Sequence, residues 1–180
     1  MGAWPRVPYD RAASATRDLP QASSLAKVRG LVEAVAAGHG ASARAAGDAV
    51  GLSARHAAYY AAAASVTLGL VALGGRRLVL TESGRALLAT PAGSLAERDA
   101  LATVIRESTS IGSIAPDLLD GDGPSREALT RRLFHAGLSE ATARRRASTL
   151  LSWRRYVQRP EVGGGSPARA EAGRPRRAQP

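Results

Sequence analysis

Residues Gly51 to Val71 read GLSARHAAYYAAAASVTLGLV, and this stretch decides the fold. Ser53 is expected to cap a helix, because its hydroxyl can accept hydrogen bonds from the free amides of the first turn. Small or apolar residues recur at helical spacing and predict one inward face: Ala57, Ala61, Ala64 and Leu68. The outer face carries Arg55, His56 and Tyr59 in its first two turns. The stretch therefore predicts a turn and the recognition helix of a helix-turn-helix, with these three side chains placed to touch DNA.

The residues before this stretch predict two more helices. The first begins at Ser23 or Ser24, ends at Gly38 and Gly40, and has an apolar face of Leu25, Val28, Leu31, Val32 and Val35. A short helix follows, from Ser42 or Ala43 to about Val50. Gly51-Leu52 is then the turn into the recognition helix.

Residues 70–80 follow a different pattern from the preceding helix and predict a β-hairpin. Val71 and Leu73 face Leu78 and Leu80 across Gly74-Gly75, and both glycines can adopt the positive φ of a tight turn. Arg76 and Arg77 follow the tip, where we expect them to contact phosphate or the minor groove. A helix-turn-helix followed by a hairpin with a basic tip is a winged helix. Thr81 then caps a short helix from Glu82 to Ala89.

The tripeptide Gly-Leu-Ser occurs again at residues 137–139 and begins a second copy of the recognition helix, 139–157. Its expected inward residues are Ala143, Ala147, Leu150, Leu151 and Val157. Arg144, Arg145 and Arg146 are expected to bind phosphates or base edges, but successive residues lie 100° apart on a helix. At least one of them should therefore face the protein and pair with an acid such as Asp117 or Asp120. The alternative is a coincidental match, because helix starts use few residue types.

The remaining second half predicts further helices and no second wing. Ser94 caps a helix to about Glu107, with Leu95, Leu101, Val104 and Ile105 as core residues. Residues 110–119 fit a short helix, and Ser125 starts another to about Ala136. We therefore expect a mainly α protein with a winged-helix domain at 23–91 and a second, wingless helix-turn-helix-like unit at 94–158. Disordered ends are expected at 1–22 and 159–180, the latter as a basic tail.

Composition limits the function further. The 180 residues include no cysteine, so a cytosolic protein without disulfides or thiolate zinc sites is expected. No apolar run approaches the roughly 20 residues that cross a bilayer, and no membrane association is expected. The formal net charge is +10, with Lys27 the only basic residue that is not arginine. A basic balance favours nucleic acid as the partner, although a GC-rich genome would also enrich arginine.

Charge is distributed unevenly along the second half. Residues 94–123 hold six acids and two arginines, whereas 139–158 hold five arginines and one glutamate. Genome bias would spread arginine evenly, so the segregation indicates a functional basic surface. The acidic 94–123 surface is a candidate docking site for a protein partner. The alternatives are a solvated face or pairing between the two segments.

No catalytic or cofactor motif emerges from the sequence. His39, His56 and His135 are scattered and lack the spacing of a helical metal site. The glycine-rich 38–43 stretch follows a helix rather than a strand, which argues against dinucleotide binding. No phosphate-binding loop or hydrolase motif is present. We therefore expect neither an enzyme nor a bound metal or cofactor.

Two stretches resemble known bacterial modules. The run Leu80-Thr81-Glu82-Ser83-Gly84-Arg85-Ala86-Leu87-Leu88, after the predicted wing, is similar to bacterial winged-helix DNA-binding domains. The run 139–149, with Trp153 after it, resembles the tandem winged-helix module that accompanies restriction endonucleases and AAA-type proteins. The resemblance covers residues 25–157. It implies that the protein binds double-stranded DNA and has no catalytic activity of its own. The expected role is a transcriptional regulator or DNA-targeting accessory protein; the alternatives are a protein-docking module or a targeting subunit of a restriction or AAA-type system.

Overall fold

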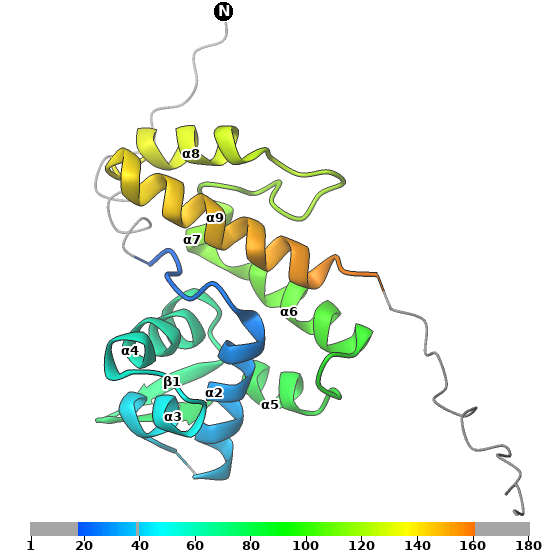
Figure 1. The fold of residues 1–180 in the computed structure, drawn as a ribbon. Helices are drawn as coiled ribbons and strands as arrows, with labels where there is room; N and C mark the ends of the chain where they lie inside the picture. The colour runs from blue at the N-terminus through cyan, green and yellow to red at the C-terminus, as the bar shows by residue number, and fades with distance from the viewer. Residues whose placement is uncertain (1–17, 39, 161–180) are drawn as a thin grey trace, which may run out of the picture.

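The computed structural model describes residues 18–38 and 40–160, which are mostly helical with one small antiparallel sheet (Figure 1). The elements are α2 (Leu25–Ala37), α3 (Ala43–Ala49), α4 (Ala54–Ala62), the π-helical turn η1 (Ala63–Thr67), β1 (Val71–Gly74), β2 (Arg77–Leu80), α5 (Glu82–Leu88), α6 (Leu95–Glu107), α7 (Thr109–Gly112), α8 (Arg126–His135) and α9 (Glu140–Val157). The predicted mainly α fold is confirmed. Most of the ends predicted to be disordered, 1–17 and 161–180, and His39 lie outside the described residues.

Serine caps set the start of α2, α3 and α4. The hydroxyls of Ser24, Ser42 and Ser53 each accept a hydrogen bond from the amide three residues later. Helix α4 continues directly into η1, and Gly69, with φ +61°, ends the pair. The predicted inward face of the recognition helix is confirmed, because its four residues are all buried in the core.

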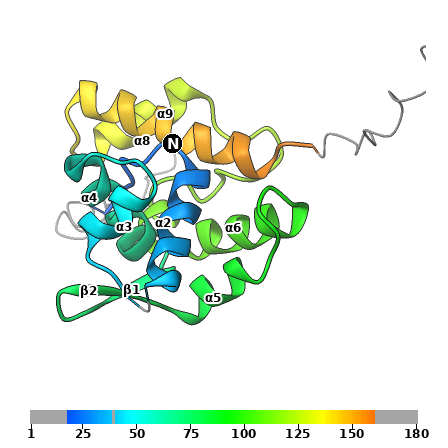
Figure 2. The same ribbon diagram turned by 60° about the horizontal axis from the view of Figure 1, so that its bottom comes forward.

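The hairpin forms as expected, but its tip lies one residue further along the chain. Gly74 pairs with Arg77, so the two-residue loop consists of Gly75 and Arg76. Only Gly75 of the two glycines has positive φ, at +67°. The prediction that both glycines form the turn is therefore wrong, because the pairing of Leu73 with Leu78 fixes the register. Figure 2 shows the hairpin projecting beside α3 at the edge of the molecule.

A bridge between Ala41 and Leu78 ties the hairpin to the helices. The Ala41 amide donates to the Leu78 carbonyl at 3.1 Å, and the Leu78 amide donates back at 2.7 Å. The chain order is thus helix, bridge, helix, helix and hairpin. This arrangement is compatible with a winged helix.

The two predicted helix-turn-helix copies share the backbone pattern of their turns. Gly51 and Gly137 both have positive φ, at +68° and +98°. The next amide, of Leu52 or Leu138, donates five residues back, at 2.9 Å and 3.2 Å respectively. These are the bonds of a Schellman ending. That the two units are related remains a prediction.

The first copy differs from the second in how closely its helices approach. A Cβ atom built on Gly47 of α3 would lie 2.2 Å from the Cβ of Ala57 in α4. The equivalent position of the second copy is Leu133, which is fully buried. The α8–α9 pair therefore accommodates a large side chain where α3 and α4 are in close contact.

Replacement of Gly47 by alanine is expected to destabilise the fold by about 1–3 kcal/mol, because the new methyl group overpacks against Ala57. Urea unfolding followed by circular dichroism measures the change. The matched control is Gly112→Ala, where an added Cβ has nothing within 4 Å. Equal stability of the two variants would show that α3 and α4 can separate at no cost.

One continuous core joins the two halves of the described chain. It runs from Leu25 of α2 to Trp153 of α9, and Trp153 is fully buried. Leu101 and Ile105 of α6 are buried as predicted. Leu95 is 49% exposed, so its assignment to the core is wrong. Six residues at 100° each place it well away from Leu101 around the helix.

The segment 18–22, predicted to belong to the disordered N-terminus, is packed. Leu19, Pro20 and Ala22 are buried. The Thr67 hydroxyl donates to the Asp18 carbonyl at 2.7 Å. The sequence shows no periodicity here because the segment is extended rather than helical, and its apolar residues fill the space beside η1 and α9.

Candidate nucleic-acid interface

The three groove residues predicted on α4 form one contacting cluster. The Arg55 guanidinium donates from Nε to the Tyr59 hydroxyl at 3.0 Å and lies 5.7 Å from the centre of the Tyr59 ring. The His56 ring meets the Tyr59 ring edge-on, with centroids 6.3 Å apart. The Ser53 hydroxyl and His56 Nδ1 are hydrogen-bonded at 2.9 Å. Spacings of three and four residues bring these side chains together on one face.

This α4 cluster (Arg55, His56 and Tyr59) is accessible. Arg55 and His56 are exposed, and Tyr59 is half-buried. The hydrogen bond to Tyr59 raises the pKa of Arg55. A guanidinium, an imidazole and a phenol together offer charged and neutral hydrogen-bond donors, as well as acceptors, for phosphates and base edges.

The two wing arginines have different surroundings. Arg76 lies at the hairpin tip and is exposed. Arg77 begins β2, and its Nη2 donates to the carbonyl of Gly40. Arg77 thus holds the hairpin against the segment between α2 and α3, which leaves Arg76 as the freer of the two predicted phosphate ligands.

The three consecutive arginines of α9 also separate. Arg144 pairs with Glu140 one turn earlier, and Arg145 is exposed and donates to the Thr142 hydroxyl at 3.3 Å. Arg146 is half-buried, and its Nε is buried without a hydrogen-bond partner among the described residues. Burial lowers the pKa of Arg146, an effect that neighbouring Arg145 adds to and Tyr59 of α4 opposes.

The expectation that one of these arginines faces the protein is confirmed by Arg146, but the expected acid partner is wrong. Asp117 binds both terminal nitrogens of Arg132 on α8, one of them at 2.8 Å. This bond lowers the pKa of Asp117. Asp120 is exposed, and no ion pair joins it to the described arginines. The sequence does not indicate this pair, because Arg132 and Asp117 are fifteen residues apart and share no periodic pattern.

A buried polar network that the sequence did not indicate connects α2, α6 and α9. Glu97 is fully buried and lies 4.0 Å from Arg29 Nη1. Its Oε1 accepts from the Tyr156 hydroxyl at 3.0 Å, and its Oε2 accepts from the Gly93 amide. Ser94 and Glu97 have the spacing of a capping box, which was the available signal. The network positions α9 relative to the first unit.

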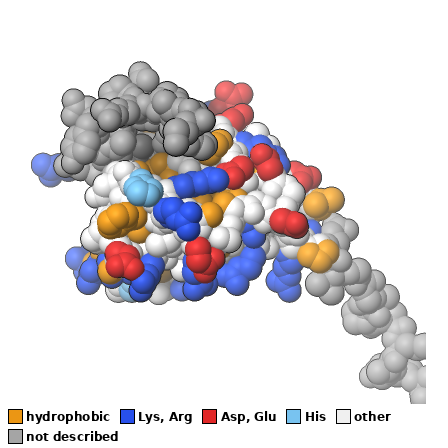
Figure 3. Space-filling model, turned by 90° about the horizontal axis from the view of Figure 1, so that it is seen from above, with side chains coloured by type: hydrophobic (Ala, Val, Ile, Leu, Met, Phe, Trp, Pro, Cys, Tyr) orange, Lys and Arg blue, Asp and Glu red, His pale blue; other side chains and the backbone are white. Residues whose placement is uncertain are grey.

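The acidic 94–123 surface is smaller than its sequence suggests. Glu97 is buried and Asp117 is paired with Arg132, so the exposed acids are Asp99, Glu107, Asp120 and Asp122. Figure 3 shows acidic and basic side chains mixed on the face seen from above. A protein partner for this surface remains a prediction.

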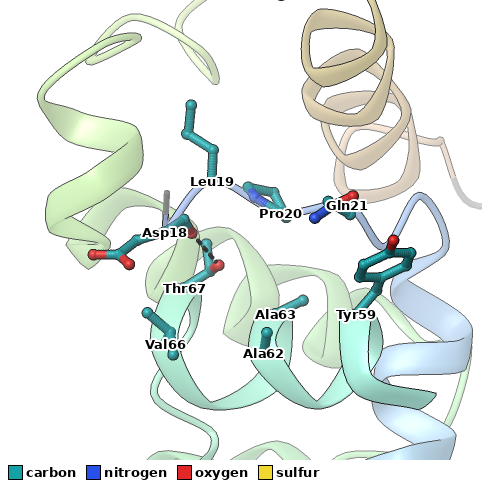
Figure 4. A pocket seen from close by; sticks show the side chains of 9 residues that line it. All are labelled: Asp18, Leu19, Pro20, Gln21, Tyr59, Ala62, Ala63, Val66 and Thr67. Carbon is teal, nitrogen blue, oxygen red and sulfur yellow. Dashed lines mark hydrogen bonds between the residues drawn. The ribbon is translucent and has the colours of Figure 1, made fainter. Parts of the chain in front are cut away.

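A small pocket lies beside the α4 cluster (Figure 4). The segment 18–21 forms one wall, and Tyr59, Ala62, Ala63, Val66 and Thr67 form the other. No group of three or more possible metal ligands occurs in the described part of the chain. None of the helices described in the structure has the length and apolarity to cross a bilayer.

Comparison of the chain with protein-family models, with curated proteins and with solved structures found no match. The assignment of a function therefore depends on the residues themselves.

Proposed function

We propose that this protein binds double-stranded DNA by placing the first two turns of α4 in the major groove. The observation that carries the proposal is the α4 cluster, which follows directly after the helix-turn-helix turn and is open to solvent. The first turns of a recognition helix are the part that contacts base edges in this motif. The wing tip supplies Arg76 for the adjacent backbone.

The charge of the chain suits this role. The net charge is +10, and arginine provides nearly all of the positive side chains. Arginine can bind phosphate and also the O6 and N7 atoms of guanine in a bidentate manner. The proposed role is that of a transcriptional regulator or of a DNA-targeting accessory protein, including one that serves a restriction or AAA-type system.

Binding to duplex DNA is expected to weaken steeply with salt. Two phosphate contacts, from Arg76 and Arg145, give a log–log slope of about −2, because each releases condensed counterion. Fluorescence anisotropy with a labelled mixed-sequence duplex at several salt concentrations measures the slope.

Arg76→Ala is expected to reduce that slope by about one. Its matched control is Arg85→Ala on α5, whose guanidinium donates to the Leu80 carbonyl at 3.3 Å. Salt-independent binding, or no binding at low salt, would contradict DNA binding and favour docking of a protein on the acidic 94–123 surface.

A further inference from the structure

The two recognition-type helices, α4 and α9, lie close together. The extended segment 18–22 passes between them and is bonded to both sides. The Asp18 carbonyl accepts from Thr67 in η1, the continuation of α4, and the Ala22 carbonyl accepts from Trp153 of α9, each at 2.7 Å. Figure 4 shows this segment passing above α4, with α9 beside it. This segment therefore links α9 to the continuation of α4.

The starts of the two helices lie on the same side of the molecule (Figure 1). Helix α9 begins near α4 and runs away from it, as Figures 1 and 2 both show. Arg146, in the second turn of α9, is half-buried and within the electrostatic influence of Tyr59, in the second turn of α4. In the repeat, Arg146 is equivalent to Tyr60, the neighbour of Tyr59. Equivalent parts of the two copies are thus adjacent.

This placement conflicts with reading two successive major grooves. Paired helix-turn-helix units that read two half-sites place them about 34 Å apart, one turn of DNA. The bonds from Thr67 to Asp18 and from Trp153 to Ala22 are separated by no more than the roughly 18 Å that five fully extended residues can span. The shared core and the buried Glu97 network hold the two units in this arrangement.

We propose that α9 does not read a second half-site but acts as a phosphate clamp beside the single groove that α4 reads. Arg145 is the clamping residue, since it is exposed, whereas Arg144 is paired with Glu140 and Arg146 faces the protein. One protein copy then needs only about one helical turn of duplex. This inference rests on the proposed DNA binding and adds the size of the site and the role of the second copy.

The test compares the full chain on labelled mixed-sequence duplexes of about 15 and about 30 base pairs, roughly one and a half and three helical turns. The clamp predicts affinities within about fivefold of each other, a difference explained by the larger number of positions on the longer duplex. An affinity for the short duplex more than about fiftyfold lower would overturn the clamp, because binding would then require two separated base-reading helices. Absence of binding to both duplexes would instead overturn the proposed function and the clamp together.

Arg145→Ala provides a second readout. It is expected to weaken binding to all duplexes alike and to reduce the salt slope by about one. The control is Arg131→Ala, an exposed arginine of α8. Helix α8 lies on the opposite side of α9 from α4 (Figure 1). An unchanged slope in Arg145→Ala, or a loss of discrimination between a selected and a scrambled duplex, would overturn the clamp while leaving DNA binding in place.

Discussion

Replacement of Glu97 by alanine is expected to destabilise the protein by about 3–5 kcal/mol. The carboxylate is fully buried and receives hydrogen bonds from Tyr156 and from the Gly93 amide, with Arg29 4.0 Å away. Its removal leaves the buried Arg29 guanidinium with one carboxylate partner among the described residues, Glu33, whose side chain is 50% exposed. Chemical denaturation at neutral pH, with a single fitted m-value, measures the loss.

Two variants test whether this effect comes from the buried network. Glu107→Ala removes an exposed acid at the end of the same helix and should change stability by no more than about 0.5 kcal/mol. Tyr156→Phe removes one hydroxyl and should cost about 1–3 kcal/mol, because Glu97 then loses one of its donors. A Glu97→Ala variant as stable as Glu107→Ala would contradict the stabilising role of the network.

Loss of the α4 cluster is expected to reduce discrimination between DNA sequences. Arg55→Ala or Tyr59→Ala should each cost about 1–3 kcal/mol on a preferred duplex selected from a random pool, and much less on a scrambled one. The reason is that base contacts specify sequence, whereas phosphate contacts position the protein. Competition binding against both duplexes measures the difference.

The contact between the two side chains makes a sharper test possible. Arg55 donates to the Tyr59 hydroxyl at 3.0 Å, so the double variant should cost less than the sum of the single variants. Arg44→Ala is the matched control, since it removes an exposed arginine of α3 that lies 3.9 Å from Asp48. If Arg44→Ala lowers discrimination as much as Arg55→Ala does, α4 is not the reading helix.

The sequence alone predicted the elements of this fold with good accuracy. The caps at Ser24, Ser42, Ser53, Thr81, Ser94 and Ser125 all form. The first turns of α4 present Arg55, His56 and Tyr59 on one face, as periodicity indicated. These features depend on residues at most four apart in the chain, where residue type and spacing largely determine the outcome.

Other features were decided only by the tertiary structure. Four features could not be predicted from spacing: which of the three arginines of α9 is buried, the hydrogen bond from Arg77 to the Gly40 carbonyl, the packing of residues 18–22 and the Glu97 network. Each joins residues that are distant in sequence, so it depends on how the helices pack and not on any local pattern. Three consecutive arginines look equivalent in the sequence. Their different partners on α9 arise because a helix turns each side chain by 100°, so that only Arg146 faces the protein.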